Sequence, residues 1–138
     1  PSLNLIETDG GYLDIESKDC ELDIDFKILR ATLTVASNSI VLEGESVRVL
    51  TTYAISKLNG DSWLSTEDAF KQWITLGGKS DSEQSRMAWE RNKIRGKLVE
   101  QKVENAGKLF YRKREGVDWL HSLTLSKDNI YIKNFHSE

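Results

Sequence analysis

Residues 80–101 read SDSEQSRMAWERNKIRGKLVEQ, a polar segment interrupted by regularly spaced apolar residues. Ser80 and Glu83 have the spacing of a capping box, in which two backbone N–H groups at the start of a helix find side-chain acceptors. One narrow apolar stripe follows, at spacings of seven and four, and consists of Met87, Ile94 and Leu98. The pattern predicts an amphipathic helix over residues 80–101.

The opposite side of this predicted helix is polar and partly basic. On a helical wheel that advances about 100° per residue, it carries Ser82, Ser85, Arg86, Trp89, Asn92, Lys93 and Gly96. Side chains of Arg, Asn, Ser and Lys can contact base edges and phosphates in the major groove of DNA. For the helix taken alone, the alternative is an ordinary solvated surface.

Charge is unevenly distributed along the 138 residues, whose formal net charge is −3. Residues 1–78 hold six Lys or Arg and 13 Asp or Glu, whereas residues 79–114 hold 11 and five. Residues 115–138 hold two and four. The net charge argues against a nucleic-acid partner, but phosphates respond to a local positive surface, which the basic block of residues 79–114 can supply.

The N-terminal part of the chain has the signals of β-strands. Residues 3–6 and 12–15 flank Asp9-Gly10-Gly11, which favours a hairpin. Residues 22–26 alternate apolar and acidic residues with period two, and residues 31–35 and 39–42 flank another tight turn. We expect residues 1–42 to form a small antiparallel sheet with one buried face, whose Asp and Glu residues serve solubility.

The hydrophobic period changes at Glu43. Residues 47–58 follow three-four spacing and predict a helix that ends at Asn59-Gly60. Ser65 begins a second capping pattern, which predicts a shorter helix that Gly77-Gly78 ends. The helix at residues 80–101 is then the third.

A basic hairpin is predicted after the third helix. Asn105-Ala106-Gly107 marks a turn, and residues 109–114 and 117–120 read as two strands around Gly116. Arg112, Lys113 and Arg114 would lie near its tip. In the C-terminal tail, residues 123–125 and 130–132 flank residues 126–129, which predicts one more hairpin.

This order of elements resembles the effector domains of OmpR/PhoB-type bacterial response regulators, over roughly residues 21–120. Three segments carry the resemblance: residues 42–50, at a strand end leading into a first helix; Ile94-Arg95-Gly96-Lys97-Leu98, similar to a Leu-Arg-x-Lys-Leu motif; and Gly116-Val117-Asp118-Trp119, similar to Gly-Val-Gly-Tyr. The chain departs from the family at Arg91, where an apolar residue is usual, and at Asp118, which replaces a glycine.

The resemblance implies an α+β fold, a winged helix-turn-helix with an N-terminal antiparallel sheet and a C-terminal hairpin, the wing. The single domain would comprise a sheet (1–42), three helices plus the wing (43–120) and a β extension (121–138). The function expected is sequence-specific binding of double-stranded DNA in a transcriptional regulator, with helix 80–101 in the major groove and the wing, residues 108–120, on the backbone. The DNA-contacting residues would be Ser85, Arg86, Trp89, Asn92, Lys93, Arg95, Lys97, Arg112, Lys113 and Arg114.

The alternative function is a non-enzymatic winged-helix module for protein–protein interaction, because winged helices serve both purposes. Such a module would use the acidic sheet or Trp89 as its docking face. Trp89 is ambiguous for this reason, since a Trp could also pack against the wing or a partner. A protein partner or a homodimer therefore remains open.

No catalytic or metal-binding pattern stands out. Cys20, His121 and His136 lack the ligand spacing of a zinc site, and we expect His121 to be a surface or half-buried residue beside Trp119 and Leu120. Gly77-Gly78-Lys79-Ser80 is similar to the end of a phosphate loop, but the first glycine of that motif would fall at Trp73. We therefore expect no enzyme activity and no cofactor, and, from the single cysteine and the lack of an apolar membrane span, a cytoplasmic protein without a membrane partner.

Overall fold

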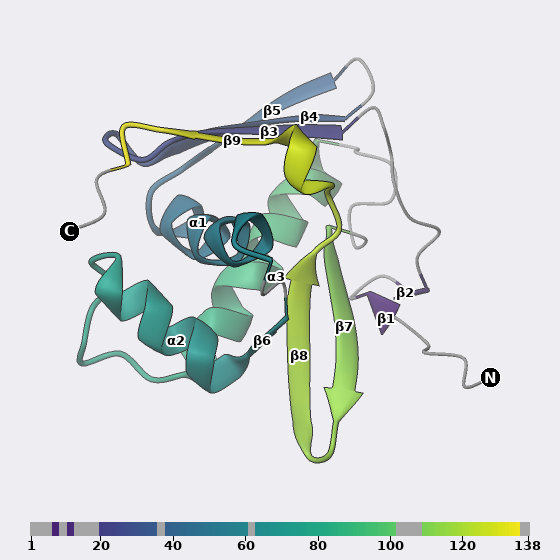
Figure 1. Cartoon of the computed structure of the whole chain (residues 1–138). Coiled ribbons are helices and arrows are strands. Elements are labelled where there is room, and N and C mark those ends of the chain that lie inside the picture. Colours follow the sequence, from purple (N-terminus) through teal and green to yellow (C-terminus); the bar gives the residue numbers. More distant parts are fainter. Residues whose placement is uncertain are drawn as a thin grey trace.

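The computed structural model describes residues 7–8, 11–12, 20–35, 38–60, 63–101 and 109–135. Within them the chain forms an α+β fold of three α-helices and two β-sheets (Figure 1). The helices are α1 (Glu45–Leu58), α2 (Thr66–Thr75) and α3 (Ser85–Glu100). The strands are β1 (Glu7–Thr8), β2 (Gly11–Tyr12), β3 (Cys20–Asp25), β4 (Arg30–Val35), β5 (Asn38–Glu43), β6 (Leu64–Ser65), β7 (Phe110–Glu115), β8 (Asp118–Leu123) and β9 (Ile130–Lys133).

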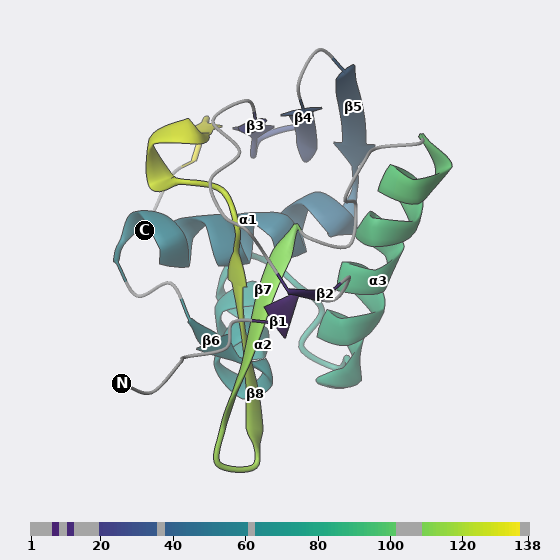
Figure 2. The ribbon, with the colours of Figure 1, turned by 90° about the vertical axis from the view of Figure 1, so that its right-hand side faces the viewer.

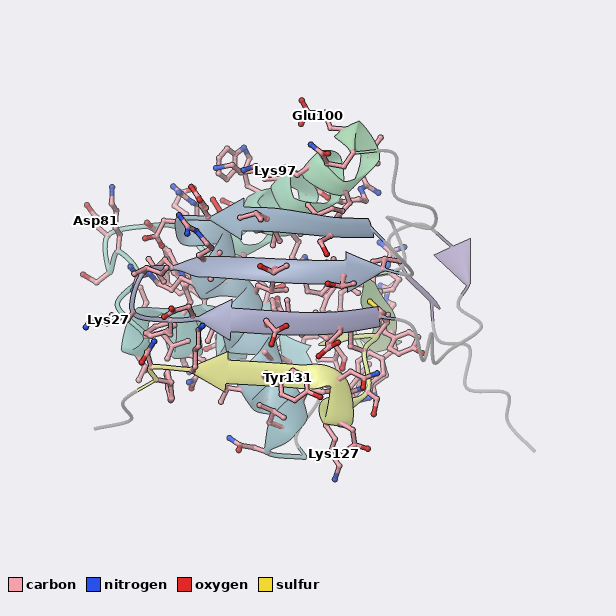
Figure 3. All side chains as sticks on the ribbon, turned by 90° about the horizontal axis from the view of Figure 1, so that it is seen from above. Lys27, Asp81, Lys97, Glu100, Lys127 and Tyr131 are labelled. Atoms are coloured by element: carbon pink, nitrogen blue, oxygen red, sulfur yellow. The ribbon has the colours of Figure 1, made fainter. Side chains whose placement is uncertain are left out.

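The first sheet has the strand order β5-β4-β3-β9 and covers α1 (Figure 1). The period-two alternation predicted for this region is confirmed, because Leu22, Ile24, Leu33 and Leu42 are buried while Glu21 and Asp23 are exposed. Figure 3 looks onto the polar outer face, with Tyr131 on β9 and Lys27 in the turn between β3 and β4.

The predicted C-terminal hairpin is wrong. Strand β9 pairs in parallel with β3, with Leu22 opposite Ile130, and so completes the first sheet. Residues 127–129 form a short 3-10 helix, capped by the Ser126 hydroxyl, which accepts a hydrogen bond from the Asp128 N–H. Burial of Ile130 within the sheet, together with the ladder to β3, outweighs the local hairpin pattern.

The second sheet has the order β2-β1-β7-β8-β6 and joins distant parts of the chain. Strands β1 and β2 form an antiparallel pair around the predicted Asp9-Gly10 turn, but β1 pairs next with β7. The expectation that residues 1–42 form one sheet is therefore wrong for this pair. The predicted strand at residues 3–6, residues 13–15 of the predicted strand 12–15, the turn at residues 105–107 and His136 lie outside the described residues.

Helix α1 lies at the centre of the molecule, between the first sheet on one side and α2, α3 and the β7–β8 hairpin on the other (Figures 1 and 2). Its predicted end is confirmed, since Asn59 is the C-cap and Gly60 has φ +84°. The cap of α2 is also confirmed, because the Ser65 hydroxyl accepts a 3.1 Å hydrogen bond from the Asp68 N–H.

Helix α3 begins later than its capping-box pattern predicts. It starts at Ser85, and its N-cap, Gln84, makes no side-chain cap hydrogen bond. The residues before it form a turn closed by a 3.1 Å hydrogen bond from the Ser82 N–H to the Lys79 carbonyl. Ser80 is therefore part of the connection between α2 and α3, and Met87, in the first turn of α3, is buried in the core.

Candidate nucleic-acid interface

One side of α3 packs into the core, and the opposite side is open. The predicted apolar stripe is confirmed, since Met87, Ile94 and Leu98 are all buried. On the opposite side, Ser85, Trp89, Asn92, Lys93 and Gly96 are exposed. The helical wheel therefore placed most of the outward residues correctly, and the structure brings them together on one face.

Arg86 departs from the fully outward position expected for it. Its side chain is half-buried, and its Nη2 lies 3.4 Å from Oε1 of Glu90, one turn later. Glu90 is itself fully buried, and its Oε2 accepts a 3.2 Å hydrogen bond from the Ser46 hydroxyl of α1. A buried carboxylate requires such partners, so Glu90 connects the outer face of α3 to the central helix.

The Trp89 ring lies between two cations on the outer face of α3. The Arg86 guanidinium carbon is 5.0 Å from the ring centroid and the Lys93 ammonium nitrogen is 5.2 Å from it. Both distances are in the range of cation–π attraction. The side chain nevertheless remains 54% exposed. We define Arg86, Trp89 and Lys93 as the α3 cluster.

Arg91, the residue that departs from the family pattern, is buried rather than outward. Its Nη1 donates a 2.9 Å hydrogen bond to the Tyr53 hydroxyl of α1. Its charge also reaches His121 of β8. Burial, followed by the charges of Arg91 and Arg112, lowers the pKa of His121 to about 3.

The expectation that His121 is a surface or half-buried residue is wrong, because the side chain is 4% exposed. The physical reason is its place in the second sheet. There His121 is flanked by β7 and β6, opposite Arg112 and Leu64. Arg112 and Arg91 both act on its ring electrostatically, so the neutral imidazole is the stable form in the folded chain.

The three hairpin cations are divided between the two faces of β7, because successive side chains of a strand point to opposite sides. Arg112 and Arg114 lie over the ring of Trp119, at 4.4 Å and 5.6 Å from its centroid. Lys113 lies over Trp63, at 4.5 Å. The hairpin turn uses Gly116, whose φ is +64°.

Arg95 and Lys97 are half-buried and lie to either side of the outer face of α3, as expected for flanking positions. Figure 3 shows Lys97 and Glu100 toward the end of α3 that extends beyond the β5 edge of the first sheet. Gly96, between Arg95 and Lys97 in the sequence, has open space around it: a Cβ atom placed there would meet nothing within 4 Å.

Sequence reasoning missed Glu90, Trp63 and Trp119. A signal existed for the aromatic contacts. Arg86 and Lys93 stand three before and four after Trp89, which is helical contact spacing. A turn at Gly116 places Arg114 opposite Trp119. The burial of Glu90 had no such signal, because its hydroxyl partner comes from another helix.

Other kinds of site have little support among the described residues. No three His, Cys, Asp or Glu side chains gather there in a way that could hold a metal ion. Cys20 is a half-buried free thiol, and burial raises its pKa to about 11, which makes it a poor nucleophile. The helices in the described ranges are too short or too polar to cross a membrane.

The outer face of the first sheet holds a shallow open hollow whose lining includes Asp25, Arg30 and Lys133. Its charges are largely satisfied by neighbours: Asn134 donates a 2.9 Å hydrogen bond to Asp25, and Arg30 pairs with Glu43 at 3.1 Å. The hydrogen bond from Asn134 is the main cause that lowers the pKa of Asp25.

Comparison of the chain with protein-family models, with curated proteins and with solved structures found no match.

Proposed function

We propose that this chain is a DNA-binding domain in which α3 enters the major groove of a duplex and the β7–β8 hairpin contacts the sugar–phosphate backbone. The observation that carries the proposal is the outer face of α3. It presents Arg86, Asn92 and Lys93 on a helix whose other side is fixed in the core. Asn and Arg are the side chains that make bidentate contacts to adenine and guanine.

The order of the elements supports a winged-helix arrangement. Three helices precede the β7–β8 hairpin, and the short strand β6, between α1 and α2, pairs with β8. The hairpin projects beyond the helices, and α3 runs beside it in Figure 2. Such a layout allows a helix and a hairpin to contact one duplex together.

The distribution of charge supports the same function. Residues 79–114 carry the excess of basic residues, and this segment contains the whole of α3 and most of β7. The acidic residues of the first sheet lie on its outer face, on the opposite side of α1 from the hairpin (Figure 1). Phosphates would therefore meet a locally positive surface.

The proposal includes sequence-specific recognition, as in the output part of a transcriptional regulator. Specific recognition requires side chains held in a defined geometry, and the ion pair between Glu90 and Arg86 supplies this for one residue of the face. A bidentate contact from Arg or Asn to the correct base contributes about 1–3 kcal/mol of discrimination.

The test measures binding to a mixed-sequence duplex by fluorescence anisotropy, and the titration is repeated at a series of salt concentrations. Binding is expected to weaken linearly in the logarithm of salt, with each neutralised phosphate contributing about 0.9 to the slope. Lys93→Glu and Lys113→Glu should each weaken binding and reduce the slope by about 1. Lys27→Glu is the matched control, since this exposed lysine lies at the end of the first sheet (Figure 3).

A protein-interaction module is the second candidate, and the exposure of Trp89 is the observation that favours it. A large exposed aromatic side chain is typical of the centre of a protein interface. If duplexes fail to bind even at low salt, a protein partner becomes the better proposal. Binding of such a partner should be lost in the Trp89→Ala variant and retained in the Lys113→Glu variant.

A further inference from the structure

The outer face of α3 presents an unusual combination, an exposed aromatic ring set between two positive charges. Arg86 lies one turn before Trp89 and Lys93 one turn after it, so the indole lies between them along the helix. Both cations lie over the ring, yet 54% of Trp89 remains exposed, so part of the indole is accessible to a ligand.

The α3 cluster is held in place from inside the protein. Glu90 is fully buried, and one of its oxygens lies 3.4 Å from Arg86 while the other accepts the Ser46 hydroxyl. Burial of a carboxylate in this position costs solvation free energy, and burial of an apolar residue would not have this cost. The ion pair joins Arg86 to this buried carboxylate, while the same guanidinium lies over the Trp89 ring.

The chemistry of the cluster defines what it can bind. An exposed apolar ring flanked by two cations complements an apolar group that projects from anionic surroundings. In duplex DNA, the C5-methyl of thymine is such a group, because it projects into the major groove between two phosphate backbones. Gly96, further along the same face, leaves the helix backbone bare and permits a close approach.

We propose that the exposed part of the Trp89 ring contacts a thymine C5-methyl in the major groove, with Lys93 directed to a flanking phosphate. Trp89 is then a specificity-determining residue, and the recognised site contains at least one thymine at the position that it meets. This inference rests on the proposed DNA binding and adds the base that one side chain reads.

The experiment compares two polymers that differ only in this methyl, alternating poly(dA-dT) duplex and alternating poly(dA-dU) duplex. The whole chain is titrated with each polymer at the same salt concentration. Uracil keeps every hydrogen-bonding group of thymine, so hydrogen-bonded contacts are unchanged. Binding to the thymine polymer is expected to be tighter by about fourfold for each methyl buried against Trp89.

Three variants make the comparison specific. Trp89→Ala should bring the ratio of the two affinities to about one, while Trp89→Phe, which keeps an apolar ring, should retain part of it. Trp119→Ala is the matched control, because Trp119 also carries cations over its ring but lies on the hairpin. It should leave the ratio unchanged. Circular dichroism establishes that each variant is folded.

The outcomes separate this inference from the function on which it rests. Equal binding of the wild-type chain to both polymers would overturn the thymine contact and leave DNA binding intact. A ratio that survives in Trp89→Ala would assign the methyl contact to another residue and refute the role of Trp89. Absence of binding to either polymer, at low salt, would refute DNA binding itself.

Discussion

Acid should destabilise this protein through His121. The imidazole is 4% exposed and lies near two guanidinium groups, Arg91 and Arg112. Burial and these two charges lower its pKa from 6.5 to about 3. The folded chain therefore holds a neutral His121 over a pH range in which the same residue is protonated in the unfolded chain.

The sign and size of the effect follow from proton linkage. Between pH 6.5 and about pH 3 the unfolded chain binds one more proton, so the free energy of unfolding falls as the pH falls through this window. Above pH 6.5 the imidazole is neutral in both the folded and the unfolded chain, so its titration removes no stability there. Each pH unit below it removes about 1.4 kcal/mol, which gives a loss of about 2 kcal/mol on going from neutral pH to about pH 5.

Urea unfolding, followed by circular dichroism at neutral pH and at about pH 5, measures this loss. His121→Gln removes the titrating group, so its stability should change much less between the two conditions, even though the substitution lowers stability at neutral pH. The matched control is His136→Gln, at the other histidine of the chain, which should keep the wild-type dependence. A wild-type stability that does not change with pH, or a His121→Gln variant with the full wild-type loss, would refute the reasoning.

Three further outcomes are expected. Tyr53→Phe removes the oxygen that accepts the Arg91 hydrogen bond and should lower the free energy of unfolding by about 1–3 kcal/mol, measured by urea unfolding. Glu90→Gln should destabilise by a similar amount and also weaken duplex binding, because Arg86 loses its charged partner. Gly96→Ala should raise stability by about 0.5–1 kcal/mol, since the added methyl meets no neighbour, but should reduce duplex affinity if α3 lies close to the groove.

Local patterns predicted most of the helices and strands, and long-range pairing explains the main errors. The periodicity of residues 47–58 and the cap at Ser65 were sufficient for α1 and α2. The position of β9 was not accessible in the same way. Its alternation, with Ile130 and Ile132 on one side, suits a hairpin as well as a parallel pair with β3, and the choice depends on a strand about a hundred residues earlier.

Two similar capping patterns had different outcomes, and here too the cause is tertiary structure. Ser65 and Ser80 each precede three residues that favour a helix start, yet only Ser65 forms a cap. Residues 77–84 are needed to connect α2 to α3, and Gly78 in this connection packs against the ring of Trp73. Tertiary packing therefore sets where α3 begins, and a local pattern does not contain that information.

The outward face of the candidate site could be predicted from the sequence, but the buried polar residues behind it could not. A helical wheel is enough to place Trp89 and Lys93 together. Glu90 and Arg91 lie at the margins of the apolar stripe, where polar residues normally face solvent. They are buried because α1 offers Ser46 to one and Tyr53 to the other. This complementarity between two helices cannot be read from either helix alone.

The polar contact between α1 and α3 yields a last prediction, which separates stability from function. Replacing both partners of a buried hydrogen bond with apolar residues of similar shape can be nearly neutral or stabilising, and the half-buried Arg86 keeps access to solvent when Glu90 is removed. The double variant Ser46→Ala/Glu90→Leu should therefore unfold at a similar or higher urea concentration than the wild type. Its Arg86 would be released, so binding to duplex DNA should weaken.

A double variant that is stable and binds duplexes as tightly as the wild type would show that the Glu90 contact has no part in binding. A double variant that is strongly destabilised would show that Glu90 serves folding instead. The expected combination, unchanged stability with weaker binding, is specific to a buried carboxylate retained to orient a surface arginine. It would also explain why α3 keeps a charged residue where an apolar one would pack at lower cost.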